Sequence, residues 1–275
     1  MTNIINPVVV LGGLGLLFGV LLSIASKAFV VEVDPKVEAV LNALPGANCG
    51  ACGYPGCEGC AIAIAEGKAA VTACTIGGQK VAENVATIMG VNAATMEKKV
   101  AVVHCQGDCE KAKDKYIYHG IQDCRIQATL AGGQKECSYG CLGCGTCYDV
   151  CPFDAIRMIN GIAVINRDKC TACNKCVEIC PVKIIEMVPY DKTAVVKCKS
   201  EDPGKLVRGY CSVGCIGCKI CVKNCPTEAF SFENNLASIN YDKCIDCLLC
   251  IEKCPTNAID NSSIISEDFA KEFAS

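Results

Sequence analysis

The distribution of cysteine constrains what this chain can fold into more than any other feature of its sequence. Cysteine occupies 27 of the 275 positions, a density at which it becomes a structural theme. Ten of the cysteines recur at one fixed offset of 74 positions. The first set is Cys124, Cys137, Cys141, Cys144, Cys147, Cys151, Cys170, Cys173, Cys176 and Cys180, and the second is Cys198, Cys211, Cys215, Cys218, Cys221, Cys225, Cys244, Cys247, Cys250 and Cys254. The chain therefore carries two copies of one module.

Cysteine at this density indicates one of three chemistries: disulfides, zinc sites or iron–sulfur clusters. Disulfides are typical of small domains in oxidising compartments. This chain is long, its cysteine count is odd, and no cleavable signal segment is evident. It also has no Trp and only 5% aromatic residues, which argues against one large conventional core. We therefore expect several small modules, each closed around metal.

The spacing of the cysteines separates zinc from iron–sulfur clusters. Each copy contains the run C-x2-C-x2-C-x3-C-P twice, for example from Cys141 to Cys151-Pro152. This is the pattern of bacterial two-cluster ferredoxins, in which three cysteines of a run bind one [4Fe–4S] cluster and the fourth binds its neighbour. Zinc sites instead use two cysteine pairs separated by a longer insert. The runs therefore predict [4Fe–4S] clusters, with loop N–H groups directed at the sulfurs.

The ferredoxin pattern implies crossed ligation, which brings the two clusters of each copy close together. In the first copy the predicted ligand sets are Cys141, Cys144, Cys147 with Cys180, and Cys170, Cys173, Cys176 with Cys151. In the second copy they are Cys215, Cys218, Cys221 with Cys254, and Cys244, Cys247, Cys250 with Cys225. Neighbouring clusters favour one-electron transfer, and we assign no residue as an acid, base or nucleophile.

A different motif precedes these runs. Its cysteines are Cys49, Cys52, Cys57 and Cys74, and the glycines between the first three allow the backbone to curl closely around a ligand. Four thiolates with one long insert could hold either zinc or an iron–sulfur cluster, so the spacing alone leaves both alternatives open.

Four more cysteines precede the first ferredoxin run: Cys105, Cys109, Cys124 and Cys137. We predict that they bind an additional cluster, which would raise the number of clusters from five to six. The second copy has no counterpart of Cys105 or Cys109 at the 74-residue offset, which argues against this grouping. With six clusters assigned in this way, Cys60, Cys198 and Cys211 have no assigned role.

The N-terminal segment has the composition of a membrane helix. Residues 1–26 contain no charged side chain, and the apolar stretch from Ile5 to Ala25 is long enough to cross a bilayer. A buried core helix is the alternative, but the rest of the chain offers little to bury it. Lys27 and the other basic residues follow the span, so the positive-inside rule predicts a single-pass anchor with the cluster domains in the cytoplasm.

The anchor, the segment ANCGACGYPGC at residues 47–57 and Cys74 together resemble the B subunit of the Rnf complex, a membrane-bound, ion-translocating ferredoxin:NAD oxidoreductase. The order of the parts matches over nearly the whole chain. This chain has two ferredoxin modules where the simplest members have one, as in the longer type of anaerobic bacteria. The resemblance implies that the first motif binds a [4Fe–4S] cluster.

The resemblance also implies partners. The chain would lie in a bacterial cell membrane, accept electrons from reduced ferredoxin and pass them to other membrane subunits and to subunits that carry flavin and reduce NAD. Sodium ions or protons would be translocated elsewhere in the complex, because no charged residue lies in the predicted span. The alternative is a stand-alone, membrane-tethered polyferredoxin. Basic stretches at residues 111–115 and 197–208 are either solvated surface or a dock for an acidic carrier; no nucleic-acid partner is expected.

The expected fold class is α+β. The predicted parts are a transmembrane anchor (1–27), a small four-cysteine [4Fe–4S] domain (28–95), a cysteine-rich connector (96–140), ferredoxin-like module 1 (141–190), ferredoxin-like module 2 (191–262) and an acidic tail (263–275). Locally, composition predicts helices at 58–73 and 79–90, a strand that includes Val100–Val103, and a short connector at 31–48 that ends in a turn.

Overall fold

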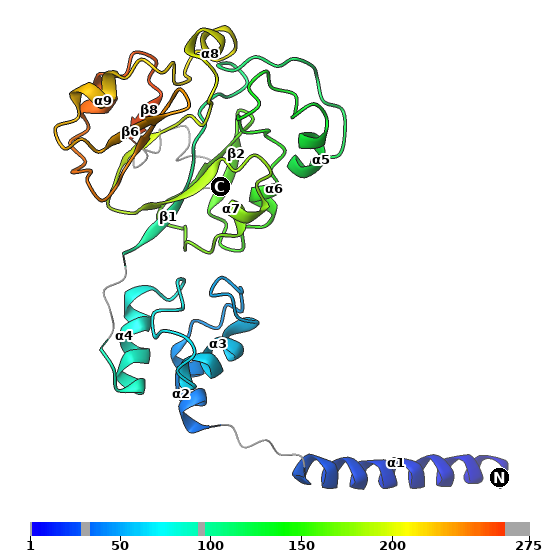
Figure 1. Ribbon diagram of the computed structural model, residues 1–275. Coiled ribbons are helices and arrows are strands. Elements are labelled where there is room, and N and C mark those ends of the chain that lie inside the picture. Colours follow the sequence, from blue (N-terminus) through cyan, green and yellow to red (C-terminus); the bar gives the residue numbers. More distant parts are fainter. Residues whose placement is uncertain (1, 29–33, 93–96, 262–275) are drawn as a thin grey trace.

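The computed structural model describes residues 2–28, 34–92 and 97–261, so the expected acidic tail lies outside the described residues. Figure 1 shows three parts in chain order: a single helix, a small helical unit and a larger part with both helices and strands. The single helix is α1 (Thr2–Ala28), and the helical unit contains α2 (Pro35–Ala43), α3 (Gly56–Ala65) and α4 (Gly78–Met89).

Helix α1 is exposed along the part whose side chains are described. Leu11, Leu16 and Leu22 are 70%, 74% and 69% exposed. Among the residues whose side chains the structure describes, which in α1 are 10–26, no helix is long and apolar enough to cross a membrane.

The helical unit packs around a small aliphatic core. Val40, Ile64 and Val85, one from each helix, are almost fully buried in the same cluster. Helix α2 lies where the sequence predicted a connector, and that expectation was wrong. Asp34 caps the helix by accepting the backbone N–H of Lys36 at 2.8 Å, and Pro35 occupies the first turn, where proline is tolerated. The two predicted helices are present as α3 and α4, although α3 ends earlier, at Ala65.

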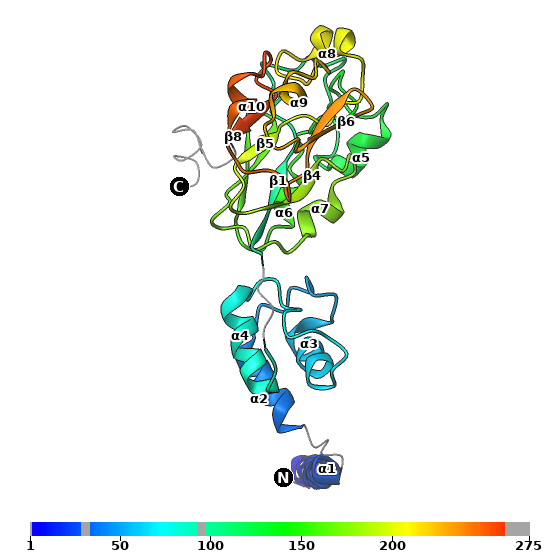
Figure 2. The same cartoon turned by 60° about the vertical axis from the view of Figure 1, so that its left-hand side comes forward.

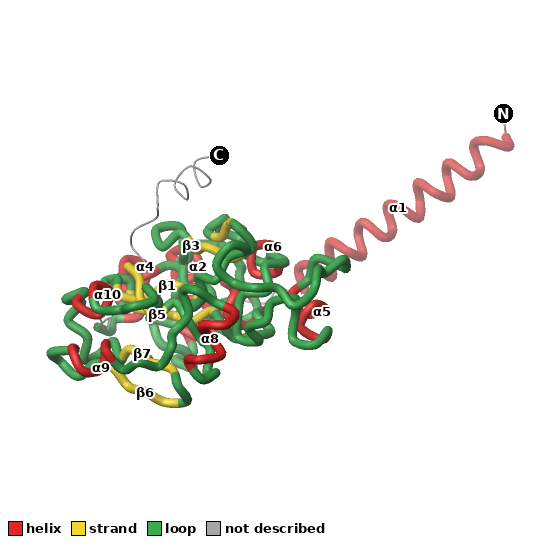
Figure 3. The backbone as a smooth tube through the Cα atoms, turned by 90° about the horizontal axis from the view of Figure 1, so that it is seen from above, coloured by secondary structure: helices red, strands yellow, loops and turns green. Residues whose placement is uncertain are grey.

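The larger part consists of short elements joined by long loops, which are green in Figure 3. Its first half contains β1 (Lys99–Val103), α5 (Cys124–Thr129), α6 (Thr146–Asp149), β2 (Ile156–Ile159), β3 (Ile162–Ile165), α7 (Lys175–Ile179) and β4 (Ile185–Pro189). Its second half contains β5 (Ala194–Val196), α8 (Gly204–Tyr210), α9 (Ile220–Asn224), β6 (Phe230–Glu233), β7 (Leu236–Ile239), α10 (Leu249–Glu252) and β8 (Ile259–Asn261).

The strands form two-stranded antiparallel sheets: β2 pairs with β3, β6 with β7, β1 with β4 and β5 with β8. Figure 2 shows β1 and β4 near the centre of the larger part. The predicted strand at Val100–Val103 is confirmed as β1, whose last four residues are buried. Cysteines belong to the core itself, because Cys141, Cys147 and Cys176 pack in one cluster with Ile156 and Ile184.

The pairing of β1 with β4 is equivalent to the pairing of β5 with β8. Val103 lies opposite Ile185, and Val196 lies opposite Ile259, the residue 74 positions after Ile185. The next residue repeats the match: the N–H of His104 donates to Ile184 O at 2.8 Å, and the N–H of Lys197 donates to Ala258 O at 2.7 Å. The strand that precedes the first cysteine run of each module therefore pairs with the last strand of that module.

Candidate iron–sulfur sites

The second module brings together the four cysteines that crossed ligation requires. Cys215, Cys218 and Cys221 belong to one loop, and Cys254 comes from the loop that ends at β8. All four line one cavity, whose lining also includes Val196, Phe232 and Ile259. The fourth thiol thus comes from the other run of the module.

The first module repeats this arrangement. Cys141, Cys147 and Cys180 line a cavity together with Cys124. Cys144 lies beside Cys141 and Cys124, and its Sγ donates to Gln127 Oε1 at 3.1 Å.

The second predicted set of module 1 is also gathered. Burial raises the pKa of the Cys173 and Cys176 thiols, and the nearby Cys151 and Cys170 raise it further. Cys151, which belongs to the first run, therefore lies among the cysteines of the second run. In module 2, the Cys250 thiol lies near Cys244 and Cys247. The N–H of Ala229 donates to Cys225 Sγ at 3.4 Å, and that of Asp246 donates to Cys244 Sγ at 3.4 Å.

The helical unit holds the remaining predicted set. Cys49, Cys52, Cys57 and Cys74 line one cavity, together with Cys60. Asn48, to which the sequence assigned no role, organises the loop: its Oδ1 accepts the N–H of Cys57 at 2.8 Å. Burial raises the pKa of Cys60 to about 12. Cys60 is 1% exposed and packs in the core of the unit.

The four cysteines predicted to bind an additional cluster are not brought together as one group. Cys105 and Cys137 line a cavity whose other two thiols belong to Cys198 and Cys211. Cys124 instead lies beside Cys144 and lines the cavity of module 1, and Cys109 is exposed. The predicted grouping thus needs correction, because the 74-residue offset did not reveal which strands pair. Cys198 and Cys211, to which the sequence assigned no role, thus lie in the same cavity as Cys105 and Cys137.

The donor set suits iron–sulfur clusters. Thiolates are the soft ligands that such clusters use. Burial raises the pKa of Cys141 to about 11 and that of Cys176 to about 12, so these thiols ionise readily only when a bound cation supplies positive charge. Backbone N–H groups also point at sulfur, as at Cys254 Sγ, which accepts the N–H of Ala258 at 3.2 Å. Within the described ranges, no three His, Cys, Asp or Glu side chains are placed to hold a single metal ion.

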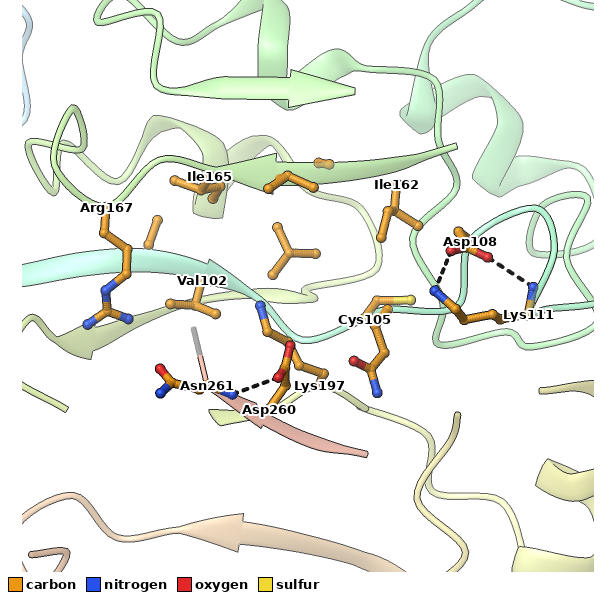
Figure 4. Close-up of a pocket in the computed structure, with 15 residues that line it drawn as sticks. Val102, Cys105, Asp108, Lys111, Ile162, Ile165, Arg167, Lys197, Asp260 and Asn261 are labelled. Carbon is orange, nitrogen blue, oxygen red and sulfur yellow. Dashed lines mark hydrogen bonds and ion pairs between the residues drawn. The ribbon is translucent and has the colours of Figure 1, made fainter. Parts of the chain in front are cut away.

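Another cavity of the larger part lies beside Cys105 (Figure 4). Its lining combines strand residues such as Val102 and Ile165 with charged Arg167, Lys197 and Asp260. Figure 4 shows Cys105 just beyond the end of β1, next to the ion pair between Asp108 and Lys111, whose Oδ2 and Nζ lie 2.7 Å apart. This cavity contains one cysteine and none of the predicted ligand sets.

Thiol-lined cavities repeated along two equivalent modules define an iron–sulfur protein of the ferredoxin class. Comparison with protein families agrees. A family model named FeS, for an Fe-S cluster domain, matches residues 44–76. Two models described as 4Fe-4S dicluster domains match residues 137–187 and 214–258.

Curated relatives identify the family. The chain is 50% identical over 244 residues to the B subunit of the Na(+)-translocating ferredoxin:NAD(+) oxidoreductase complex of Acetobacterium woodii, covering 88% of this chain and 73% of the relative. It is 44% identical to the B subunit of the ion-translocating oxidoreductase complex of Methanosarcina acetivorans, over 87% of this chain and 91% of the relative. It is 43% identical to the B subunit of the proton-translocating ferredoxin:NAD(+) oxidoreductase complex of Clostridium ljungdahlii, over 87% and 85%. The chain belongs to the family of Rnf complex B subunits.

Proposed function

We propose that this chain accepts electrons from reduced ferredoxin and relays them one at a time through [4Fe–4S] clusters to other subunits of a membrane-bound ferredoxin:NAD⁺ oxidoreductase. The observation that carries the proposal is the cavity shared by Cys215, Cys218, Cys221 and Cys254, in which two separate runs supply the thiols. The relatives from A. woodii and C. ljungdahlii are named as components of ferredoxin:NAD(+) oxidoreductase complexes. These names also favour the interpretation that this chain is a subunit of a complex, and not a stand-alone electron carrier.

The chain's own residues would hold at least five clusters, with the ligand sets that the runs and the first motif predict. When bound, the clusters supply the one-electron chemistry. The protein brings neighbouring sites close together through crossed ligation, and loop N–H groups stabilise negative charge on sulfur. The large apolar share of the cavity linings, such as Ile220 and Ala237 in module 2, limits contact with water, and a low local dielectric strengthens those N–H contacts.

We further propose that residues 1–27 anchor the chain as one transmembrane helix, with the cluster domains in the cytoplasm. Support comes from the sequence, which has no charge before Lys27, and from the exposed leucines of α1. Deleting residues 1–27 should give a soluble, still brown protein. Retention of that truncated chain on membranes without partner subunits would contradict a single anchor. Translocation of sodium ions or protons would then be the task of other subunits.

The exposed face of α8 is the best candidate for docking ferredoxin. Lys205 and Arg208 are exposed there, with Leu206 between them at 56% exposure. Two other basic residues of the stretches noted in the sequence are engaged in ion pairs: Lys111 with Asp108, and Lys199 with Glu186. A basic surface around an apolar residue suits an acidic carrier protein.

Electron acceptance is tested with anaerobically purified protein and reduced ferredoxin. Each electron that leaves ferredoxin should reduce one cluster of this chain, so the visible absorption of the chain should bleach in proportion to ferredoxin oxidised. Failure of reduced ferredoxin to bleach a protein that contains its full iron and sulfide would exclude this electron donor.

A further inference from the structure

Four cysteines that fall outside the ferredoxin runs meet between the two modules. Cys105, Cys137, Cys198 and Cys211 line one cavity, as do Cys215, Cys218, Cys221 and Cys254 in module 2. An ideal Cβ added to Gly107 would lie 3.3 Å from Cys211 Sγ and 3.8 Å from Cys105 Sγ. These two sulfurs therefore face each other across a glycine without a side chain.

The four cysteines form two structurally equivalent pairs. Cys105 follows Val103 of β1 by two residues, and Cys198 follows Val196 of β5 by two residues, at equivalent positions of the paired strands. Cys137 and Cys211 are equivalent by the 74-residue repeat and begin the matching segments CSYGC and CSVGC. Each module thus contributes one cysteine after its leading strand and one before its first cluster run.

The backbone contacts of the pairs are equivalent as well. The N–H of Cys141 donates to Cys105 Sγ at 3.5 Å, and the N–H of Cys215 donates to Cys198 Sγ. Likewise the N–H of Tyr139 donates to Cys137 Sγ, and that of Val213 to Cys211 Sγ. Hydrogen bonds from backbone N–H groups to sulfur orient the ligands of cluster sites and stabilise their negative charge. All four sulfurs receive them.

The surrounding backbone is built to hold the two cysteine loops together. The segment 111–115 is hydrogen-bonded on one side to 210–212, where the N–H of Lys113 donates to Tyr210 O at 2.8 Å. On its other side it bonds to 134–136, where the N–H of Glu136 donates to Lys113 O at 2.9 Å. Lys135 is 2% exposed, and its Nζ donates to Gly107 O at 2.6 Å. The site therefore includes a buried cation beside thiols that would carry negative charge.

We propose that Cys105, Cys137, Cys198 and Cys211 bind a further [4Fe–4S] cluster that links the two ferredoxin modules. This inference rests on the proposed function only in that the modules themselves hold [4Fe–4S] clusters. Cys141 and Cys215, whose N–H groups donate to this site, are also predicted ligands of the first cluster of module 1 and of module 2. A single backbone hydrogen bond therefore connects this site to a predicted cluster site in each module. A cluster here would let electrons pass one at a time between the modules, with no bond made or broken.

The test is the iron and sulfide content of the anaerobically purified full chain. The unaltered protein should contain about 24 irons, at about four per cluster, and each of Cys105→Ala and Cys198→Ala should contain about 20. The double variant Cys105→Ala/Cys198→Ala should also contain about 20, because both residues serve one cluster. Cys109→Ala is the matched control from the same loop and should stay at about 24.

Several outcomes would overturn the proposal. An iron content of about 20 in both the unaltered chain and Cys198→Ala would leave five clusters and no site here. Loss of about four irons in Cys109→Ala but none in Cys198→Ala would restore the grouping expected from sequence. Should both single variants fail to fold, native mass spectrometry of the unaltered chain decides, because a mass with five clusters excludes the site. An iron content near zero would instead reject the proposed function itself.

Discussion

The backbone N–H of Cys141 donates to Cys105 Sγ across 3.5 Å. Cys141 begins the first ferredoxin run, whereas Cys105 lies 36 positions earlier, just after β1. The contact joins a residue inside a motif to one outside every motif. It ties the cysteine-rich connector, for which the sequence already predicted an additional cluster, to the loop of the first ferredoxin run.

Crossed ligation predicts a pattern of iron loss in double variants. Cys254→Ala and Cys215→Ala should each remove about four irons, and the double variant should also remove about four, because the two thiols line one cavity. Cys254→Ala combined with Cys244→Ala should remove about eight, because these residues of one run serve different clusters. Iron analysis after anaerobic purification checks this. Equal loss in the two double variants would contradict crossed ligation.

Gly56→Ala should destabilise the helical unit more than Gly53→Ala. Both glycines have left-handed backbone, with φ of +81° and +82°, and a side chain there costs about 1–2 kcal/mol. A Cβ at Gly56 would also lie 3.0 Å from Asn48 Oδ1, which accepts the N–H of Cys57, whereas one at Gly53 meets no atom within 4 Å. Denaturant unfolding measures the difference in stability. Only Gly56→Ala should also lower the iron content; equal effects would show that the Asn48 contact is unimportant.

Lys135→Met should lower the reduction potential of neighbouring clusters. The Lys135 ammonium lies close enough to Cys141 and Cys211 to lower the pKa of both thiols, against the opposing effect of burial. A unit charge at about 10 Å and an effective dielectric of about 20 contributes about 1–2 kcal/mol, which corresponds to roughly 40–90 mV for one electron. Redox titration followed by EPR spectroscopy measures the shift. Exposed Lys115→Met is the control and should cause little change; an unshifted potential in Lys135→Met would show that this charge is screened.

Charge reversal on α8 should slow electron transfer from ferredoxin. The variant Lys205→Glu/Arg208→Glu removes a basic surface and should lower the second-order rate constant at least about tenfold at low salt. The effect should vanish at about 1 M salt, where the Debye length is about 3 Å. Stopped-flow absorbance measures the rate. Lys36→Glu/Lys80→Glu makes the same change in net charge within the helical unit, and an equal slowing there would point to a general charge effect instead of docking on α8.

The sequence by itself determined the cofactor class and the two modules, and it predicted the ligands within each run. These features could be predicted because the spacing of ligands within a loop is a local property. Cysteines that are close in the sequence can be arranged around a cluster in few ways, and the repeated spacing can be read directly from the amino-acid sequence. The family followed from the same motifs. Helix α2 was missed because Asp34 and Pro35 were read as part of a connector, although the pair forms a helix start.

Only the tertiary structure decided which distant cysteines meet. The 74-residue offset equates Cys198 with Cys124, but the strand pairing equates Cys198 with Cys105. The reason is a difference in loop length: Cys105 precedes Cys137 by 32 positions, whereas Cys198 precedes Cys211 by only 13. The extra residues carry Cys109 and Cys124 away from the junction of the modules. Hydrogen bonds between β1 and β4, and between β5 and β8, hold the strands that lead to Cys105 and Cys198, and both residues line one cavity. Spacing along the chain does not record this relationship.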